Sequence, residues 1–194
     1  MLIVGLTGGI ASGKSFVVKY LKKIKIPSHD SDGVIDLLYK KPSKLFLDYL
    51  EKNNFREAIS GGKINKGLIK SDIFNSDEKR KTIEFFLHKY VGKERKKFIE
   101  KNKSKKIIFL DIPLLFEKKL QKECDYVCST IAPLNIRKRR ALQRRGMNKR
   151  LFNLIVKTQV KNKERRLKSD FIINTQGDRK KTYLQVENMI YYLF

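Results

Sequence analysis

The residues with the clearest chemistry are Gly8 through Ser15, which fit the pattern G-x-x-x-x-G-K-S. The apolar run Leu2–Leu6 before them is typical of a strand buried on both faces, and apolar residues after them recur at helical spacing. A glycine-rich turn between a strand and a helix cradles phosphate groups, and Lys14 and Ser15 then suit the phosphates and Mg²⁺. The sequence therefore predicts a nucleoside-triphosphate site.

Acidic residues follow two further predicted strands. Asp30 and Asp32 come after the apolar segment 24–28, and Asp111 ends the run 107–110. In an open α/β sheet, the carboxyl ends of the strands face the ligand crevice. Asp111 or Asp30 is therefore a candidate for the outer shell of a Mg²⁺ ion bound by Ser15. The alternative for Asp30 is that it, or Ser31, only caps a helix over 33–39.

A cluster of arginines lies between the last two predicted strands. Arg140 and Arg144 are four residues apart, so on a helix they share a face, and planar guanidinium groups suit phosphate oxygens. For most of the cluster the better interpretation is a solvated basic helix. The cluster consists of Arg137, Arg139, Arg140, Arg144, Arg145, Arg150, Arg165 and Arg166.

The elements expected around these residues form a three-layer α/β fold. Strands separated by helices predict a five-stranded parallel sheet. The strands are expected at 2–6, 24–28, 107–110, 126–130 and 171–173. A helical insertion is expected between the second and third strands, with a turn at 61–62 and a one-sided helix across 83–91.

The composition indicates which classes of partner the chain is expected to have. The net charge of +25 is compatible with nucleic-acid binding, but the lysines are spread through nearly every segment rather than gathered in a patch. No apolar run approaches the roughly 20 residues needed to cross a membrane, and no leader segment is expected before the first strand. Cys124 and Cys128 lack the spacing of common zinc pairs, so we expect buried thiols in a reducing, cytoplasmic setting.

From end to end, the chain resembles the dephospho-CoA kinase family. Segment 6–15, LTGGIASGKS, resembles the family's LTGGIGSGKS, and 30–32 falls where the family has Asp-Ala-Asp. Segment 113–117 is similar to its PLLFE segment, 140–159 to its R-x-x-x-R-x-G…Q lid, and 169–177 to its last motif. Many kinases share the phosphate loop, whereas the other segments together are specific.

The resemblance implies transfer of the γ-phosphate of ATP to the ribose 3′-hydroxyl of dephospho-CoA, giving ADP and CoA with Mg²⁺ as cofactor. Asp32 matches the family's usual base, and Lys14, Arg140 and Arg144 complete the expected catalytic set. The expected nucleotide contacts are Gly8, Gly9, Ile10, Ala11, Ser12, Gly13, Lys14, Ser15 and Phe16. The expected acceptor contacts are Asp32, His88, Pro113, Leu114, Leu115 and Phe116.

Several positions depart from the family pattern. Ala11 stands where the family has a loop glycine, Phe16 where threonine is common, and Thr175 where the last motif usually has asparagine. The remaining departures are Asp36, Lys66, Lys89 and Ile155. The departures at 36, 66 and 155 concern only the carry-over of the family's acceptor contacts to these positions. They do not affect the phosphate loop or Asp32.

The expected organisation is a core interrupted twice. The core is assigned to 1–32, 105–136 and 166–194, the helical acceptor-binding insertion to 33–104, and the lid to 137–165. We expect a monomer or weak oligomer, with no membrane and no dedicated nucleic-acid partner. Two rival functions stay open on the residues alone: a kinase for a nucleoside or nucleotide, and a basic ATP-binding protein that acts on nucleic acid with steep salt dependence.

Overall fold

A computed structural model describes all residues, 1–194, and divides them into two compact units. Unit 1 comprises Met1–His29 and Asn102–Phe194, and unit 2 comprises Asp30–Lys101. Each unit buries a hydrophobic core of its own.

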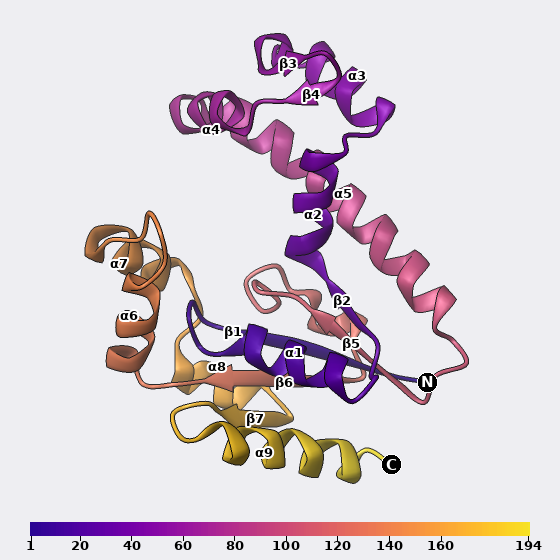
Figure 1. The fold of residues 1–194 in the computed structure, drawn as a ribbon, viewed down its shortest axis with the longest axis vertical. Helices are drawn as coiled ribbons and strands as arrows, with labels where there is room; N and C mark the ends of the chain where they lie inside the picture. The colour runs from indigo at the N-terminus through magenta and orange to yellow at the C-terminus, as the bar shows by residue number, and fades with distance from the viewer. The chain divides into compact units, whose positions relative to one another are not determined.

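Unit 1 is built on a sheet with the strand order β2-β5-β1-β6-β7 (Figure 1). Its strands are β1 (Leu2–Gly8), β2 (Ser28–Asp30), β5 (Ile107–Asp111), β6 (Tyr126–Ile131) and β7 (Phe171–Asn174). The central strand β1 pairs in parallel with β5 and β6, and β6 pairs in parallel with β7. The predicted α/β fold with a five-stranded parallel sheet is therefore confirmed.

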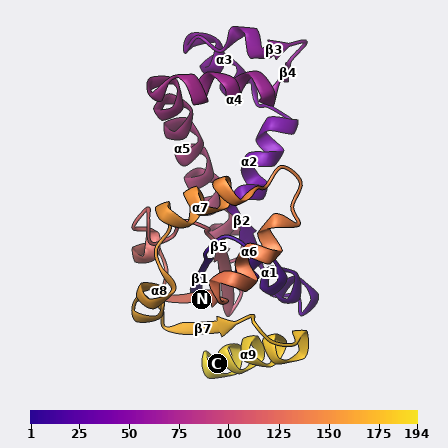
Figure 2. The same cartoon turned by 90° about the vertical axis from the view of Figure 1, so that its left-hand side faces the viewer.

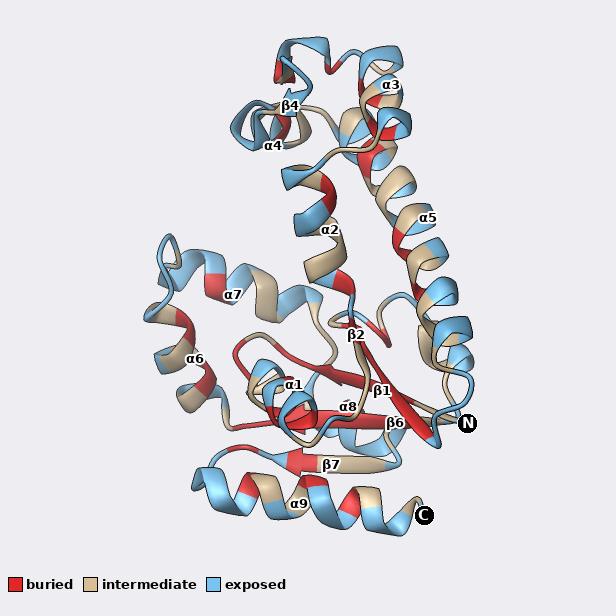
Figure 3. Ribbon diagram, turned by 45° about the vertical axis from the view of Figure 1, so that its right-hand side comes forward, coloured by how far each residue is buried: buried red, intermediate tan, exposed pale blue.

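Helices cover both faces of this sheet. Unit 1 contains α1 (Lys14–Lys23), η2 (Leu120–Glu123), α6 (Leu134–Leu142), α7 (Lys149–Thr158), α8 (Asn162–Lys168) and α9 (Arg179–Tyr192). On one face, α1 and α9 share a core with the alternating strand residues Val4, Leu6 and Phe109, and Figure 2 shows α9 beside β7. On the other face, Gly5 lies beneath Leu115. The central strands are consequently buried on both sides (Figure 3).

The strand predicted at 24–28 was wrong in its position. Residues 24–26 instead close α1: the N–H of Lys25 donates to the Lys22 carbonyl and that of Ile26 to the Leu21 carbonyl, with Lys25 at φ 59°. This is the hydrogen-bond pattern that ends a helix on a left-handed residue. The strand begins only after Pro27, at Ser28, because the apolar residues before it belong to the helix end.

Unit 2 is mainly helical. It contains α2 (Ser31–Lys40), α3 (Lys44–Lys52), η1 (Arg56–Ala58), β3 (Ile59–Ser60), β4 (Lys63–Ile64), α4 (Lys66–Asn75) and α5 (Asp77–Lys101). Its core joins α2, α3 and α5 around Phe46, which stacks on Phe86 with ring centroids 4.8 Å apart. The predicted turn is confirmed, since Gly61 and Gly62 both have positive φ between β3 and β4.

None of the helices is long and apolar enough to cross a membrane. Neither cysteine takes part in a disulfide: Cys128 is buried in β6, as expected, whereas Cys124 is only half-buried. Burial raises the pKa of the Cys128 thiol to about 12, because a thiolate is poorly solvated among the side chains of α1 and α9.

The buried thiol gives a test of the fold. In native protein at about pH 8.5, Cys128 should react with iodoacetamide roughly 10³-fold more slowly than in the unfolded chain, since both access and thiolate fraction are low. Peptide mass spectrometry after timed quenching measures this, and the same protein in concentrated guanidinium chloride is the control. Rapid native alkylation of Cys128 would contradict the packing of β6 described here.

Candidate active site

The loop from Gly8 to Gly13 joins the carboxyl end of β1 to the start of α1. Gly8 makes the closest approach, because a Cβ on it would lie 2.1 Å from Thr130 Oγ1 and 2.4 Å from Ser12 Oγ. Gly13 adopts φ 93° at the N-terminal cap of α1, a conformation that favours glycine. This helix has neither a side-chain cap nor an acidic residue in its first turn, which leaves its first amides suited to a phosphate.

Ala11 occupies a left-handed conformation, with φ 56°. This explains why the family pattern has glycine there, since a Cβ costs roughly 1 kcal/mol in this region. The Ala11 side chain is buried in a small apolar cluster with Ala141 of α6 and Phe152 of α7. Burial of the methyl group offsets part of the strain and joins the loop to the lid segment.

Two lid side chains hold Ile10 at the tip of the loop. Arg137 Nε donates to the Ile10 carbonyl at 2.9 Å, and the Ile10 N–H donates to Gln159 Oε1 at 2.8 Å. Burial and the nearby charge of Arg165 lower the pKa of Arg137. Sequence reasoning assigned neither residue a specific contact: Arg137 was one of a cluster, and Gln159 was only part of the lid pattern.

Lys14 forms an ion pair with Asp111. The two residues meet because the parallel register aligns Leu6 of β1 with Asp111 of β5, so the end of β5 lies beside the loop. Both side chains are largely buried, at 15% and 8% exposure. The pair places one positive and one negative group at the start of α1. Ser15, the neighbouring candidate metal ligand, is exposed.

Arg140 is anchored next to the loop, but Arg144 is not on the same helix. The Arg140 guanidinium donates to both Oγ1 and the carbonyl of Thr175, at 3.1 and 2.7 Å. Thr175 in turn donates to the Ser12 carbonyl, so Arg140 is one side chain removed from the phosphate loop. The expected shared helix face was wrong, since α6 ends at Leu142 and Arg144 lies exposed in the following turn.

A second buried network lies beneath the loop. Arg165 is fully buried; it donates to Glu117 Oε1 at 2.8 Å and to Thr7 Oγ1 at 3.3 Å. Thr7 Oγ1 also donates to the Pro113 carbonyl at 3.0 Å. These contacts tie the residue before the loop to the segment that follows β5, a role that was not predicted for Arg165.

The four residues after β5 that were expected to contact the acceptor differ in burial. Leu115 is completely buried, and Phe116 is 7% exposed beneath the guanidinium of Arg165. Both are core side chains in this structure, and their expected contact with the acceptor stays a prediction. Pro113 is half-buried and Leu114 is exposed, so these two keep surface for a ligand.

Phe16 points toward α9. Its ring stacks on Tyr183 with centroids 5.0 Å apart and an interplanar angle of 10°, and Arg179 lies 5.9 Å from the Phe16 ring centre. The aromatic side chain at this position therefore fastens α1 to the last helix and supplies no hydroxyl to a nucleotide.

The remaining predicted site residues belong to unit 2. Asp30 is the N-cap of α2 and accepts the Gly33 N–H at 2.9 Å, so the capping alternative is confirmed for it. Asp32 is exposed in the first turn of the same helix. His88 is exposed on α5. One turn beyond Asp32, Asp36 pairs with Lys66 at 2.9 Å, which lowers the Asp36 pKa.

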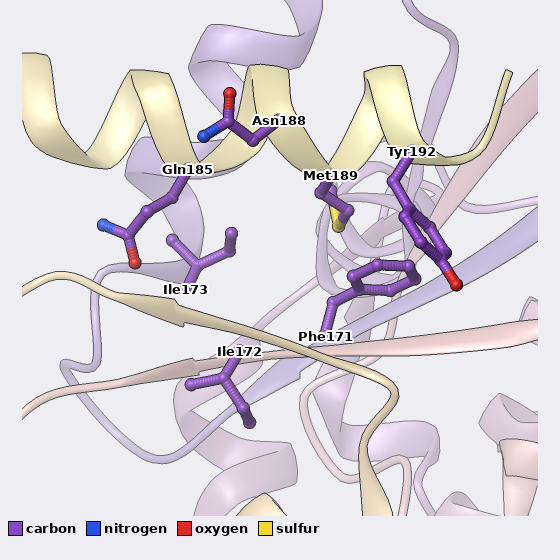
Figure 4. Close-up of a pocket in the computed structure, with 7 residues that line it drawn as sticks. All are labelled: Phe171, Ile172, Ile173, Gln185, Asn188, Met189 and Tyr192. Carbon is purple, nitrogen blue, oxygen red and sulfur yellow. The ribbon is translucent and has the colours of Figure 1, made fainter.

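An open cavity of about 270 Å³ lies between β7 and α9 (Figure 4). It is lined by Phe171, Ile172, Ile173, Gln185, Asn188, Met189 and Tyr192. None of these belongs to the phosphate loop or the lid, so we assign the cavity no part in the chemistry.

Comparisons with known proteins show the family of the chain. A family model described as dephospho-CoA kinase matches residues 2–181. The dephospho-CoA kinase of Bartonella quintana is 38% identical over 192 residues, which cover 98% of this chain and 97% of that protein. That of the Wolbachia of Brugia malayi is 33% identical over 191 residues, covering 97% and 96%.

Solved structures give the same fold. A crystal structure from Thermus thermophilus has a TM-score of 0.81 at 25% identity, covering 98% of this chain and 96% of that one. The dephospho-CoA kinase from Campylobacter jejuni has a TM-score of 0.73 at 19% identity with the same coverage. At that identity the second likeness shows the fold alone.

Because Thr130 and Ser12 lie so close to Gly8, adding one methyl group there should strongly affect stability and ATP binding. Gly8→Ala should lower the free energy of unfolding by more than about 2 kcal/mol and abolish ATP binding, because the Cβ would also lie 2.9 Å from the Thr130 carbonyl oxygen. Calorimetric melting and ATP titration measure the two effects.

The matched control is Gly92→Ala in the middle of α5, where a Cβ meets nothing within 4 Å. This change should stabilise the protein by roughly 0.5–1 kcal/mol, because alanine favours a helix interior over glycine. Equal effects of the two substitutions would overturn the description of the loop.

Proposed function

The chain belongs to the dephospho-CoA kinase family, and from that membership we propose which of its residues carry each part of the reaction. The enzyme transfers the γ-phosphate of ATP to the ribose 3′-hydroxyl of dephospho-CoA, giving CoA and ADP. Such a transfer requires alignment of the two substrates, neutralisation of phosphate charge and an acceptor for the hydroxyl proton.

The nucleotide is bound by the loop from Gly8 to Gly13 together with Lys14 and Ser15. The observation that carries this assignment is that one loop gathers Lys14, the uncapped start of α1 and, through Thr175, Arg140. On ATP binding, the Lys14 ammonium group contacts the phosphate oxygens, either in place of Asp111 or in addition to it. Phe16 contributes its backbone alone, since its ring is stacked on Tyr183.

The donor set at the start of α1 fits Mg²⁺. Magnesium usually takes few protein ligands, with phosphates and waters completing an octahedron, and Ser15 hydroxyl and Asp111 carboxylate are the hard oxygen donors it prefers. Ser15 would hold the ion directly and Asp111 through water. When bound, the ion neutralises charge on the β- and γ-phosphates. Asp30 is the weaker candidate, because it already caps α2.

The lid arginines act on the transferring phosphate. Arg140 is held beside the loop by Thr175, so its remaining N–H groups are pre-arranged for phosphate oxygens. Arg144 lies exposed in the turn after α6 and reaches the phosphate only on lid closure. Closure of the segment 137–165 also excludes water that would hydrolyse ATP.

Unit 2 supplies the acceptor side. Asp32 orients the ribose 3′-hydroxyl and accepts its proton, and the helical insertion 33–104 binds the pantetheine-bearing acceptor with help from His88. Pro113 and Leu114 add an apolar edge, with Leu115 and Phe116 as their support in the core. The enzyme works as a monomer or weak oligomer in the cytoplasm, where its substrate ATP is present.

The function is tested by ADP release from ATP and Mg²⁺ in a coupled assay. Dephospho-CoA should stimulate release strongly, whereas adenosine, cytidine monophosphate and pantetheine should not. Chelation of the metal with EDTA should abolish the stimulated rate. Stimulation by another acceptor, with none by dephospho-CoA, would retain a kinase and discard the acceptor assignment.

The base assignment predicts a selective loss of turnover. Asp32→Asn should lower kcat by about 10²-fold or more, because the amide cannot accept the hydroxyl proton, while the affinity for ATP stays within about twofold. Steady-state kinetics and ATP titration measure the two quantities.

Asp36→Asn is the matched control for Asp32→Asn. It removes the same charge one turn later on α2 and costs only an exposed ion pair with Lys66, whose contribution to stability is small. At saturating dephospho-CoA its kcat should stay near that of the wild type, whereas any lost acceptor contact would appear in KM for dephospho-CoA. A normal kcat in Asp32→Asn would remove Asp32 from the role of base.

A further inference from the structure

Thr175 immediately follows β7 and is 5% exposed. Its N–H donates to the Ile131 carbonyl at 2.9 Å, which fixes its backbone to the end of β6. Its side chain covers Gly13, since Oγ1, Cβ and Cγ2 all lie 2.8–2.9 Å from where a Gly13 Cβ would be. Thr175 is therefore held rigidly against the phosphate loop.

The Thr175 hydroxyl has its hydrogen-bonding capacity engaged on two sides. It donates to the Ser12 carbonyl at 2.6 Å, with the Ile131 carbonyl a longer second acceptor at 3.4 Å. It accepts from Arg140 Nη1 at 3.1 Å, and the Thr175 carbonyl accepts from Nη2 at 2.7 Å. Because a hydroxyl bound by a cation is a stronger donor, the two contacts reinforce each other.

The bond to Ser12 also sets the direction of an amide in the loop. The Ser12 carbonyl and the Gly13 N–H belong to one planar peptide group and point in opposite directions. When Thr175 holds the carbonyl on its own side, the Gly13 N–H is aimed away from Thr175. One hydroxyl thus controls both an amide of the loop and the guanidinium of Arg140.

We propose that Thr175 is a positioning residue for phosphoryl transfer, which presents the Gly13 amide and the Arg140 guanidinium to the triphosphate in a fixed relation. This inference rests on the proposed roles of the loop and Arg140. The chemistry it concerns is recognition of the triphosphate and depends on no particular acceptor.

Three variants separate the hydroxyl from the packing of the side chain. Thr175→Val keeps the branched shape over Gly13 and removes the hydroxyl, whereas Thr175→Ser keeps the hydroxyl and removes the methyl group. Thr182→Val in α9 is the matched control, because Thr182 is also buried and donates to a backbone carbonyl, that of Asp178 at 3.3 Å. Thr182 makes no hydrogen bond to Arg140 or to the loop.

Thr175→Val should lower kcat/KM for ATP by about 10- to 100-fold, the range expected when a charge-assisted contact is lost. Thr175→Ser should stay within about threefold of the wild type, and Thr182→Val should lower the melting temperature comparably with little kinetic change. In an Arg140→Met background, Thr175→Val should have a smaller effect than in the wild type, because the part of its effect that acts through Arg140 is already lost and only the part that acts through the Gly13 amide remains. Should Thr175→Val fail to fold, Thr175→Ala, which adds no new contact, carries the same expectation.

Equal kinetics in Thr175→Val and Thr182→Val would overturn the proposal, and so would equal losses in Thr175→Val and Thr175→Ser. Full additivity with Arg140→Met would also overturn it. ATP affinity by calorimetry provides a readout that needs no acceptor. If dephospho-CoA failed as a substrate while Thr175→Val still weakened ATP binding, the acceptor assignment alone would fall.

Discussion

The loop between β1 and α1 must keep one shape while its phosphate-binding side stays open. Residues from other parts of unit 1 hold it in that shape through hydrogen bonds. Thr130 Oγ1 bonds Ser12 Oγ at 2.7 Å, and Thr175 bonds the Ser12 carbonyl. Arg137 and Gln159 bond the two polar groups of Ile10. These partners come from β6, from α6 and from the residues that follow α7 and β7, so the shape of the loop depends on both the sheet and the lid.

Positive charge at the site is compensated unevenly. Lys14 and Arg165 each have a carboxylate partner, Asp111 and Glu117. Arg137 and Arg140 instead donate to carbonyl and hydroxyl oxygens, which satisfy N–H groups without cancelling their charge. Two guanidinium groups near the loop thus keep an electrostatic preference for an anion, and this local arrangement matters more for ATP than the total charge of +25.

The sequence predicted what depends on local pattern and missed what depends on contacts between distant segments. The strand, loop and helix around Gly8 follow from periodicity and motif spacing, and so does Asp111 at the end of β5. No local pattern could bring Gln159 to Ile10, 149 residues away. The burial of Leu115 was also not predictable, because an apolar residue gives the same signal in the sequence whether it faces a ligand or the core.

Three departures from the family pattern in unit 1, at Ala11, Phe16 and Thr175, share a physical property, because each places its side chain against protein. Ala11 packs on Ala141 and Phe152, and Phe16 stacks on Tyr183. At Ala11 the left-handed strain of roughly 1 kcal/mol is set against burial of a methyl group. A glycine at this position adopts the left-handed conformation without strain but has no side chain to pack. Alanine is strained there, and its methyl group packs against α6 and α7. Variation here changes how the loop is fastened and preserves Lys14 and Ser15, the groups we assign to phosphate and metal.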